Sequence, residues 1–289
     1  MKRLLLVFIL VTFTGCKDSK SSQGTDFNRK SKLIELFKTS NSNYPNISVH
    51  RGGMGLEKYP ENCLETMSYI NDSIKAVFEI DVSQTKDGKL ILMHDNALDR
   101  TTNGSGLVKN LNYTELKDYK LIDGYGKATP FRIPLFKDVL KWCKAKNVIL
   151  TVDIKRSVSQ AQVIDAIRAA KAEDNCVIIT YDLKQAQSAF ELAPELLLSV
   201  SARNHAELDR LIDSGIPTEN MLAFTGTRLS KASLYKRLHK EGIVCILGTL
   251  GNLDKQAEAR GEDMYQYWKS LGVDILATDR PFKAYNAIN

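Results

Sequence analysis

The chain lacks a regular cysteine pattern, a dense basic cluster and a long apolar run. Its five cysteines are scattered without the C-x-x-C spacing of zinc and redox motifs. The net charge is only +6, and the basic residues are spread along the chain without interleaved aromatics, which does not favour a nucleic-acid partner. The apolar run over residues 4–11 is too short to cross a bilayer, which takes about 20 residues.

The N-terminus has the features of an export signal. Lys2 and Arg3 precede the apolar run, and small residues lead to Cys16, a pattern that resembles a bacterial lipoprotein signal. It predicts a signal peptide over residues 1–16 with lipid attached at Cys16, and a tether and N-terminal segment over residues 17–44. The alternative is an ordinary secretory signal cut nearby. Both predict an exported domain, periplasmic or at the cell surface, where a disulfide is permitted but cannot be paired from sequence.

Residues 45–289 alternate strand-like and helical patterns. The strand-like runs cover 47–50, 77–82, 148–153, 176–181, 196–201, 220–225, 243–248 and 273–278, and the helical runs cover 134–145, 159–172, 183–192, 205–214, 229–240 and 255–270. Eight strands in alternation with helices predict one α/β domain, a (β/α)₈ TIM barrel. The Asp87-Gly88 turn predicts a β-hairpin insertion over residues 83–94 after the second strand, and a long loop over 96–132 on the active-site face.

Two histidines and three carboxylates stand in or at the ends of these runs, namely His50, Glu79, Asp81, His94 and Asp153. Alternate residues of a strand share a face, so Glu79 and Asp81 point together, and the hairpin places His94 roughly opposite Asp81. Adjacent inward-facing carboxylates require a cation or hydrogen-bond donors. The alternative is that the two acids edge an exposed strand.

Six short motifs carry a resemblance to a known family. They are His50-Arg51-Gly52, Pro60-Glu61-Asn62, Glu79-Ile80-Asp81, His94-Asp95 followed by Arg100-Thr101-Thr102-Asn103-Gly104, Ile133-Pro134-Leu135, and Thr278-Asp279-Arg280-Pro281. In this order, over most of residues 47–281, the chain resembles the glycerophosphodiester phosphodiesterase family.

The resemblance implies a site with metal, phosphate and proton-transfer groups. It assigns one divalent cation to Glu79, Asp81 and Asp153, phosphate contacts to Arg51 and Lys155, and acid/base catalysis to His50 and His94. Oxygen ligands suit Mg²⁺ or Ca²⁺. The resemblance favours His94 as base and His50 as acid, an order that the sequence itself leaves open.

The implied reaction is hydrolysis of a glycerophosphodiester to an alcohol and glycerol phosphate. One alternative is phospholipase-like cleavage of intact lipids to a cyclic phosphate. The other is a non-catalytic lipoprotein that binds phosphodiesters. The expected partners are a small phosphodiester and, through the lipid anchor, a membrane. The sequence does not determine the oligomeric state.

The sequence allows two roles for each of several side chains. The family's Trp-Thr-Val-Asn stretch is replaced here by residues 247–252, so Tyr125 and Phe131 either replace the missing aromatic wall or pack the loop. Asn62 positions its loop or touches the metal, and Glu61 contributes to the site or caps a helix beginning at Cys63. The remaining histidines, His205 and His239, are expected on the surface, and Trp142 and Trp268 in the packing.

Overall fold

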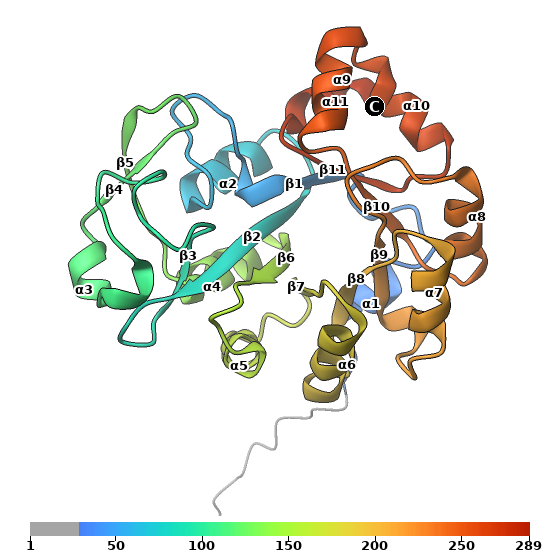
Figure 1. Ribbon diagram of the computed structural model, residues 1–289, viewed down its shortest axis with the longest axis horizontal. Helices are drawn as coiled ribbons and strands as arrows, with labels where there is room; N and C mark the ends of the chain where they lie inside the picture. The colour runs from blue at the N-terminus through green and yellow to red at the C-terminus, as the bar shows by residue number, and fades with distance from the viewer. Residues whose placement is uncertain (1–28) are drawn as a thin grey trace, which may run out of the picture.

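A closed ring of parallel strands forms the centre of the computed structural model, which describes residues 29–289 (Figure 1). The strands are β1 (Ile47–Val49), β2 (Val77–Gln84), β6 (Ile149–Ile154), β7 (Cys176–Ile179), β8 (Leu197–Ser201), β9 (Met221–Phe224), β10 (Cys245–Gly248) and β11 (Ile275–Thr278). Each pairs in parallel with its neighbours, and β1 pairs with both β2 and β11, which closes the barrel. The predicted (β/α)₈ barrel is confirmed.

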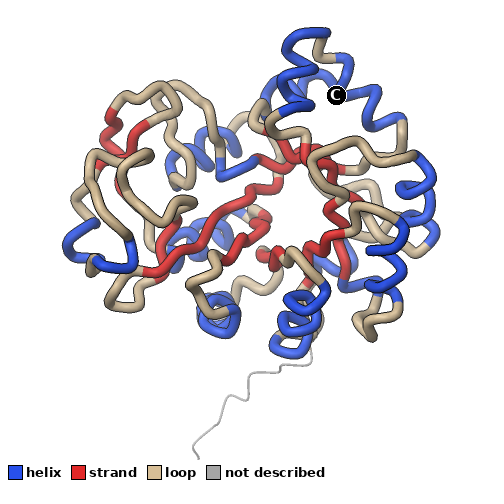
Figure 2. The backbone as a smooth tube through the Cα atoms, in the orientation of Figure 1, coloured by secondary structure: helices blue, strands red, loops and turns tan. Residues whose placement is uncertain are grey.

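Helices surround this ring (Figure 2). They are α2 (Leu64–Asn71), α4 (Phe136–Lys146), α5 (Gln160–Ala170), α6 (Leu183–Leu192), α7 (His205–Ile212), α8 (Ala232–Lys240), α9 (Asn252–Arg260), α10 (Asp263–Ser270) and α11 (Pro281–Ile288). The prediction of one continuous helix over 255–270 is wrong. Gly261 adopts φ 118°, which lies outside helical geometry, so the segment divides into α9 and α10.

The alternation of side chains along β2 separates a packed outer face from an inner face. Phe78, Ile80 and Val82 are fully buried against the surrounding helices, as the strand periodicity predicts. Inside the barrel, Val77 belongs to an apolar plug of residues from the beginnings of the strands. The short helix α1 (Lys32–Leu36) covers this plug with Leu33 and Ile34, so the N-terminal segment contributes to the core.

The predicted hairpin is confirmed. β3 (Leu90–Leu92) pairs antiparallel with β2, with Leu92 opposite Val82, and Met93 N–H donates to the carbonyl of Asp81 at 3.0 Å. His94 therefore lies one residue beyond the partner of Asp81.

The region after this hairpin is more structured than a long loop, and in that respect the prediction over 96–132 is wrong. It contains the 3₁₀ turn η2 (Val108–Asn110), α3 (Tyr113–Leu116) and a second hairpin of β4 (Lys120–Ile122) and β5 (Ala128–Arg132). Leu98, Leu116 and Leu121 belong to an apolar cluster of its own. That separate cluster holds the insertion as a folded unit beside the barrel mouth (Figure 1).

Within residues 29–289, Trp268 belongs to the main hydrophobic cluster and Trp142 packs against it, as predicted. Cys63, Cys143, Cys176 and Cys245 are free, buried thiols, and Trp268 is 1% exposed. Within the same range, no helix has the length and apolarity needed to cross a membrane. Cys16 and the predicted signal peptide lie outside the described residues.

Candidate active site

Three carboxylates meet at the carboxyl ends of β2 and β6. Asp81 and Asp153 are register partners on these adjacent strands, and Glu79 lies two residues before Asp81 on the same face. Oxygen atoms of the three carboxylates lie within 4.8 Å of one another. The strand-edge alternative is wrong, because β2 pairs with strands on both sides and Asp81 is 1% exposed.

Lys155 also contacts this carboxylate cluster. Its Nζ lies 2.5 Å from Asp81 Oδ1 and 2.8 Å from Asp153 Oδ2. Burial alone would lower the pKa of Lys155, but the two carboxylates outweigh it and the pKa is raised. The amine therefore stays charged and neutralises part of the cluster. Its predicted contact with phosphate stays a prediction.

The pKa values of the three carboxylates are shifted in different directions. Burial and the Asp81 charge raise the pKa of Glu79 well above its usual range. Burial also raises the pKa of Asp153, whereas at Asp81 the Lys155 ammonium and the Asn62 amide outweigh burial and lower the pKa. One ammonium therefore does not satisfy three carboxylates.

The donor set fits a hard divalent cation. All three side chains offer oxygen, which Mg²⁺ and Ca²⁺ prefer. Asp153 Oδ1 is buried and accepts no hydrogen bond from the described residues. A buried, unpartnered carboxylate oxygen is costly unless it contacts a cation or a donor. The cluster of Glu79, Asp81 and Asp153 can therefore hold the cation that the sequence predicts.

Asn62 fixes Asp81 through two hydrogen bonds. Its Nδ2 donates to Asp81 Oδ2 at 2.7 Å, and its Oδ1 accepts from Asp81 N–H at 2.9 Å. Asn62 has φ 52°, a left-handed conformation that asparagine tolerates better than most residues. Asn62 therefore positions Asp81, which is a candidate metal ligand.

Glu61 binds arginines, so the interpretation of Glu61 as a helix cap is wrong. Its carboxylate accepts two 2.8 Å hydrogen bonds from Arg100 and a 3.2 Å bond from Arg51. Helix α2 begins beyond it, at Leu64, without a side-chain cap. Glu61 therefore positions the two guanidinium groups.

His50 stands in the 3₁₀ turn η1 (His50–Gly52), directly after β1. Its Nδ1 lies 2.6 Å from Asp279 Oδ1, and Asp279 directly follows β11, the strand that pairs with β1. The backbone N–H of Asp279 donates to buried Asp254 at 2.8 Å, as does the hydroxyl of Thr278. Asp279 therefore orients the imidazole from a fixed position.

His94 is held from both sides of its ring. Nδ1 lies 2.7 Å from Asp95 Oδ1, and Nε2 lies 2.7 Å from an Arg51 guanidinium nitrogen. Because arginine only donates hydrogen bonds, Nε2 is the acceptor and Nδ1 carries the proton. Arg100 and then His94 hold the pKa of Asp95 well below its usual range against burial. The network thus places the Nε2 lone pair of His94 against a single donor, the Arg51 guanidinium.

Arg51 joins the metal cluster to His94. Its backbone N–H donates to Glu79 Oε2 at 2.7 Å, which requires the left-handed φ of 50°. Its guanidinium contacts Glu61 and His94, while Nε is buried without a partner among the described residues. An unpartnered cationic N–H in such a site is suited to an anionic oxygen.

A cavity of about 980 Å³ opens beside these residues, and His94, Asp153, Lys155 and Tyr181 contribute to its lining. The expected aromatic substitutes do not line it. Phe131 stacks on Tyr59, and Tyr125 is 65% exposed.

Tyr181, which the sequence analysis missed, provides the aromatic surface instead. It lies two residues after the end of β7, and a residue at the carboxyl end of a barrel strand is the signal that could have identified it. Burial and the charge of Asp153 raise the pKa of its hydroxyl, so this group stays protonated and can donate a hydrogen bond.

The sequence of this chain is similar to that of a known protein family. The model of the glycerophosphoryl diester phosphodiesterase family matches residues 50–283. A Bacillus altitudinis protein described as a glycerophosphodiester phosphodiesterase is 30% identical over 248 residues, covering 82% of this chain and 96% of its own.

Solved structures share the fold. A glycerophosphoryl diester phosphodiesterase from Parabacteroides distasonis superposes with a TM-score of 0.80 at 31% identity, covering 89% of this chain and 90% of that one. A phosphodiesterase from Oleispira antarctica, solved with the product sn-glycerol-3-phosphate, has a TM-score of 0.66 at 20% identity over 85% of this chain and 97% of that one. At 20% identity this second likeness shows the fold alone.

Proposed function

The chain belongs to the glycerophosphoryl diester phosphodiesterase family and is a glycerophosphodiester phosphodiesterase, and we propose that it hydrolyses its substrate with one divalent cation and two histidines. One observation carries the proposal. Three clustered carboxylates and two imidazoles, each oriented by an aspartate, converge at the mouth of one barrel. The products are an alcohol and glycerol phosphate.

Glu79, Asp81 and Asp153 would hold the cation. Bound there, Mg²⁺ or Ca²⁺ would act as a Lewis acid on the phosphate. The chain supplies further positive charge from Arg51 and Lys155, which compensates the anionic diester. Asn62 keeps the Asp81 carboxylate oriented throughout.

His94 acts as the general base. Its Nε2 is the unprotonated ring atom, and it accepts a proton from the attacking water, whose oxygen bonds to phosphorus as the bond to the leaving alkoxide breaks. The Nδ1–H bond to Asp95 stabilises the imidazolium that results. Arg51, which donates to the same Nε2, would turn its donor toward the phosphate when the proton arrives.

His50 acts as the general acid. The Asp279 carboxylate at 2.6 Å from Nδ1 orients the imidazole, which gives its proton to the departing alkoxide. Each proton transfer of this kind is worth about 10²- to 10⁴-fold in rate. An acid and a base acting together account for cleavage of a poor leaving group.

Product identification tests the reaction. We expect the protein with Mg²⁺ or Ca²⁺ to convert glycerophosphocholine, glycerophosphoethanolamine or glycerophosphoinositol to glycerol phosphate and the free alcohol, followed by phosphorus NMR. A cyclic phosphate released only from intact phospholipid or sphingolipid would favour the phospholipase-like alternative. Saturable binding without turnover would favour the non-catalytic alternative.

We also propose that the protein is exported and anchored to a membrane by lipid on Cys16. The support is the order of basic, apolar and small residues over positions 1–16. Cells labelled with radioactive palmitate should incorporate label into the wild-type protein and not into the Cys16→Ser variant. Equal labelling of both would contradict the anchor.

A further inference from the structure

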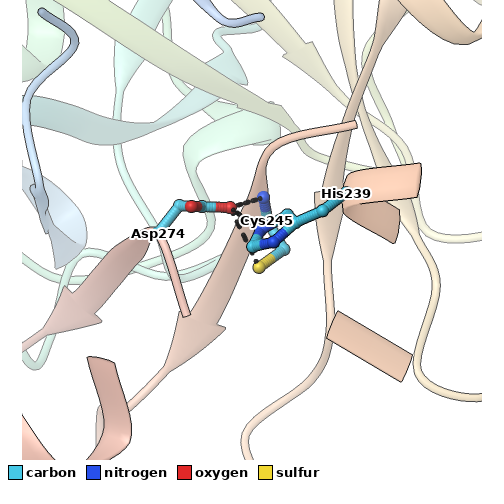
Figure 3. A group of neighbouring side chains, drawn as sticks. All are labelled: His239, Cys245 and Asp274. Carbon is cyan, nitrogen blue, oxygen red and sulfur yellow. Dashed lines mark hydrogen bonds and ion pairs between the residues drawn. The ribbon is translucent and has the colours of Figure 1, made fainter. Parts of the chain in front are cut away.

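A second cluster of metal-binding side chains lies at the opposite end of the barrel. His239 is in the last turn of α8, Cys245 is the first residue of β10, and Asp274 directly precedes β11. Figure 3 shows the three side chains pointing toward one another. They stand at the amino ends of the strands, whereas Glu79, Asp81 and Asp153 stand toward the carboxyl ends. The proposed reaction does not use this cluster.

Its geometry is close to that of a bound metal. Asp274 Oδ2 lies 2.8 Å from His239 Nε2 and 3.2 Å from Cys245 Sγ, and the three ligand atoms lie within 4.8 Å of one another. Zinc bonds of about 2.0–2.3 Å in a tetrahedron place neighbouring ligands roughly 3.3–3.8 Å apart. Small outward movements of the side chains would therefore admit the ion.

The three ligand atoms of this cluster are the kinds of atom that zinc binds. Sulfur, nitrogen and oxygen together suit zinc, whereas the all-oxygen set of the active site suits Mg²⁺ or Ca²⁺. In the structure the Cys245 thiol lies within donating distance of Asp274 Oδ2, at 3.2 Å, and of the Gly272 carbonyl, at 3.3 Å. Zinc would take the place of that thiol proton, which would be released to solvent, and the thiolate and carboxylate would balance the charge of the ion.

The surroundings hold Asp274 in place. Cys245 N–H donates to its Oδ2 at 2.8 Å, and the Tyr44 hydroxyl donates to Oδ1 at 3.4 Å; such outer contacts orient metal ligands. The Lys269 ammonium donates to the Asp274 backbone carbonyl at 2.6 Å. The His239 side chain is 35% exposed and gives the ion access.

From this juxtaposition we propose that His239, Cys245 and Asp274 bind one zinc ion with water as the fourth ligand. The ion ties the end of α8 to β10 and β11. Because the amino-terminal face of a TM barrel serves stability and the carboxyl-terminal face serves catalysis, the role of this zinc is structural.

Cobalt substitution tests the site directly, because a cysteine ligand gives a thiolate-to-cobalt charge-transfer band that an all-oxygen site cannot give. With excess Mg²⁺ present, the full chain titrated with Co²⁺ should develop this band to one equivalent. Cys245→Ser should abolish it, and Cys143→Ser, which alters another buried thiol, should retain it. No band in the wild type, or a full band in Cys245→Ser, would overturn the proposal.

A thermal measurement provides a second readout that does not depend on activity. Zinc at about 100 times its dissociation constant should raise the Tm of the wild type by roughly 5 °C or more. His239→Gln, a change at a partly exposed side chain, should fold and lose this shift. If it keeps the full zinc-dependent shift, the cluster is not the binding site. Loss of phosphodiesterase activity would leave this result unaffected.

Discussion

His94→Ala and His50→Ala are each expected to lower turnover of a glycerophosphodiester by about 10²- to 10⁴-fold. Removing His94 removes the Nε2 lone pair that accepts the proton of the nucleophile, and removing His50 removes the proton donor to the leaving alkoxide. Neither histidine belongs to the cation cluster of three carboxylates. Cation affinity should therefore remain within a few fold of the wild type, as measured by calorimetry.

The matched control for these variants is His205→Ala. His205 is exposed on α7, and its Nε2 lies 3.2 Å from the Ser233 hydroxyl. It should retain full turnover. Wild-type turnover in either His50→Ala or His94→Ala would refute the assignment of acid and base, and loss of cation binding in both would show that the histidines act as ligands.

Glu79→Gln is expected to abolish cation-dependent turnover, with a loss of at least about 100-fold. Even residues outside the coordination sphere typically contribute 10- to 100-fold to metal affinity or activity, and a direct ligand should contribute more. The glutamine oxygen can still accept the hydrogen bond from Arg51 N–H, so the local backbone is retained. The variant therefore removes the negative charge of one ligand with little change in the shape of the side chain.

The same substitution should stabilise the metal-free protein at neutral pH. Burial raises the folded-state pKa of Glu79, so the folded protein holds this proton more tightly than the unfolded chain. The stability that protonation contributes is fully present below the unfolded pKa and is lost as the pH rises through the folded pKa. Glutamine stays neutral at every pH, so the variant does not lose this stability. The difference in the free energy of unfolding between the variant and the wild type should therefore shrink as the pH falls toward 4.

Urea unfolding at several pH values, with and without cation, measures this effect. Wild type should gain stability when Mg²⁺ or Ca²⁺ is added, and Glu79→Gln should gain little, so that the order of stability reverses. Glu258→Gln, at an exposed position on α9, is the control and should follow the wild type. An identical cation response in Glu79→Gln and wild type would show that Glu79 is not a ligand.

The local pattern of apolar, polar and turn residues in the sequence was sufficient to predict most of the barrel. Period-two alternation placed Phe78 and Ile80 outside and Glu79 and Asp81 inside, because side-chain direction along a strand is a local property. The Asp87-Gly88 turn predicted the hairpin that brings His94 to the acids. The break at Gly261 was missed because a single glycine is compatible with a helix until its φ is known.

Contacts between distant segments were not predictable in the same way. The position of Lys155 between two carboxylates depends on the β2–β6 register, and Tyr181 reaches the cavity only because β7 ends beside β6. His239, expected as a surface group, meets Cys245 and Asp274 through the packing of α8 on the barrel. No sequence spacing brings these three residues together, so only the folded chain shows the cluster.

The most direct test of the catalytic account is turnover of glycerophosphocholine, glycerophosphoethanolamine and glycerophosphoinositol by protein stripped with EDTA and then reloaded. We expect stripping to remove the activity and one equivalent of Mg²⁺ or Ca²⁺ per chain to restore it. Full turnover by the stripped protein would contradict the role of Glu79, Asp81 and Asp153 as a cation site.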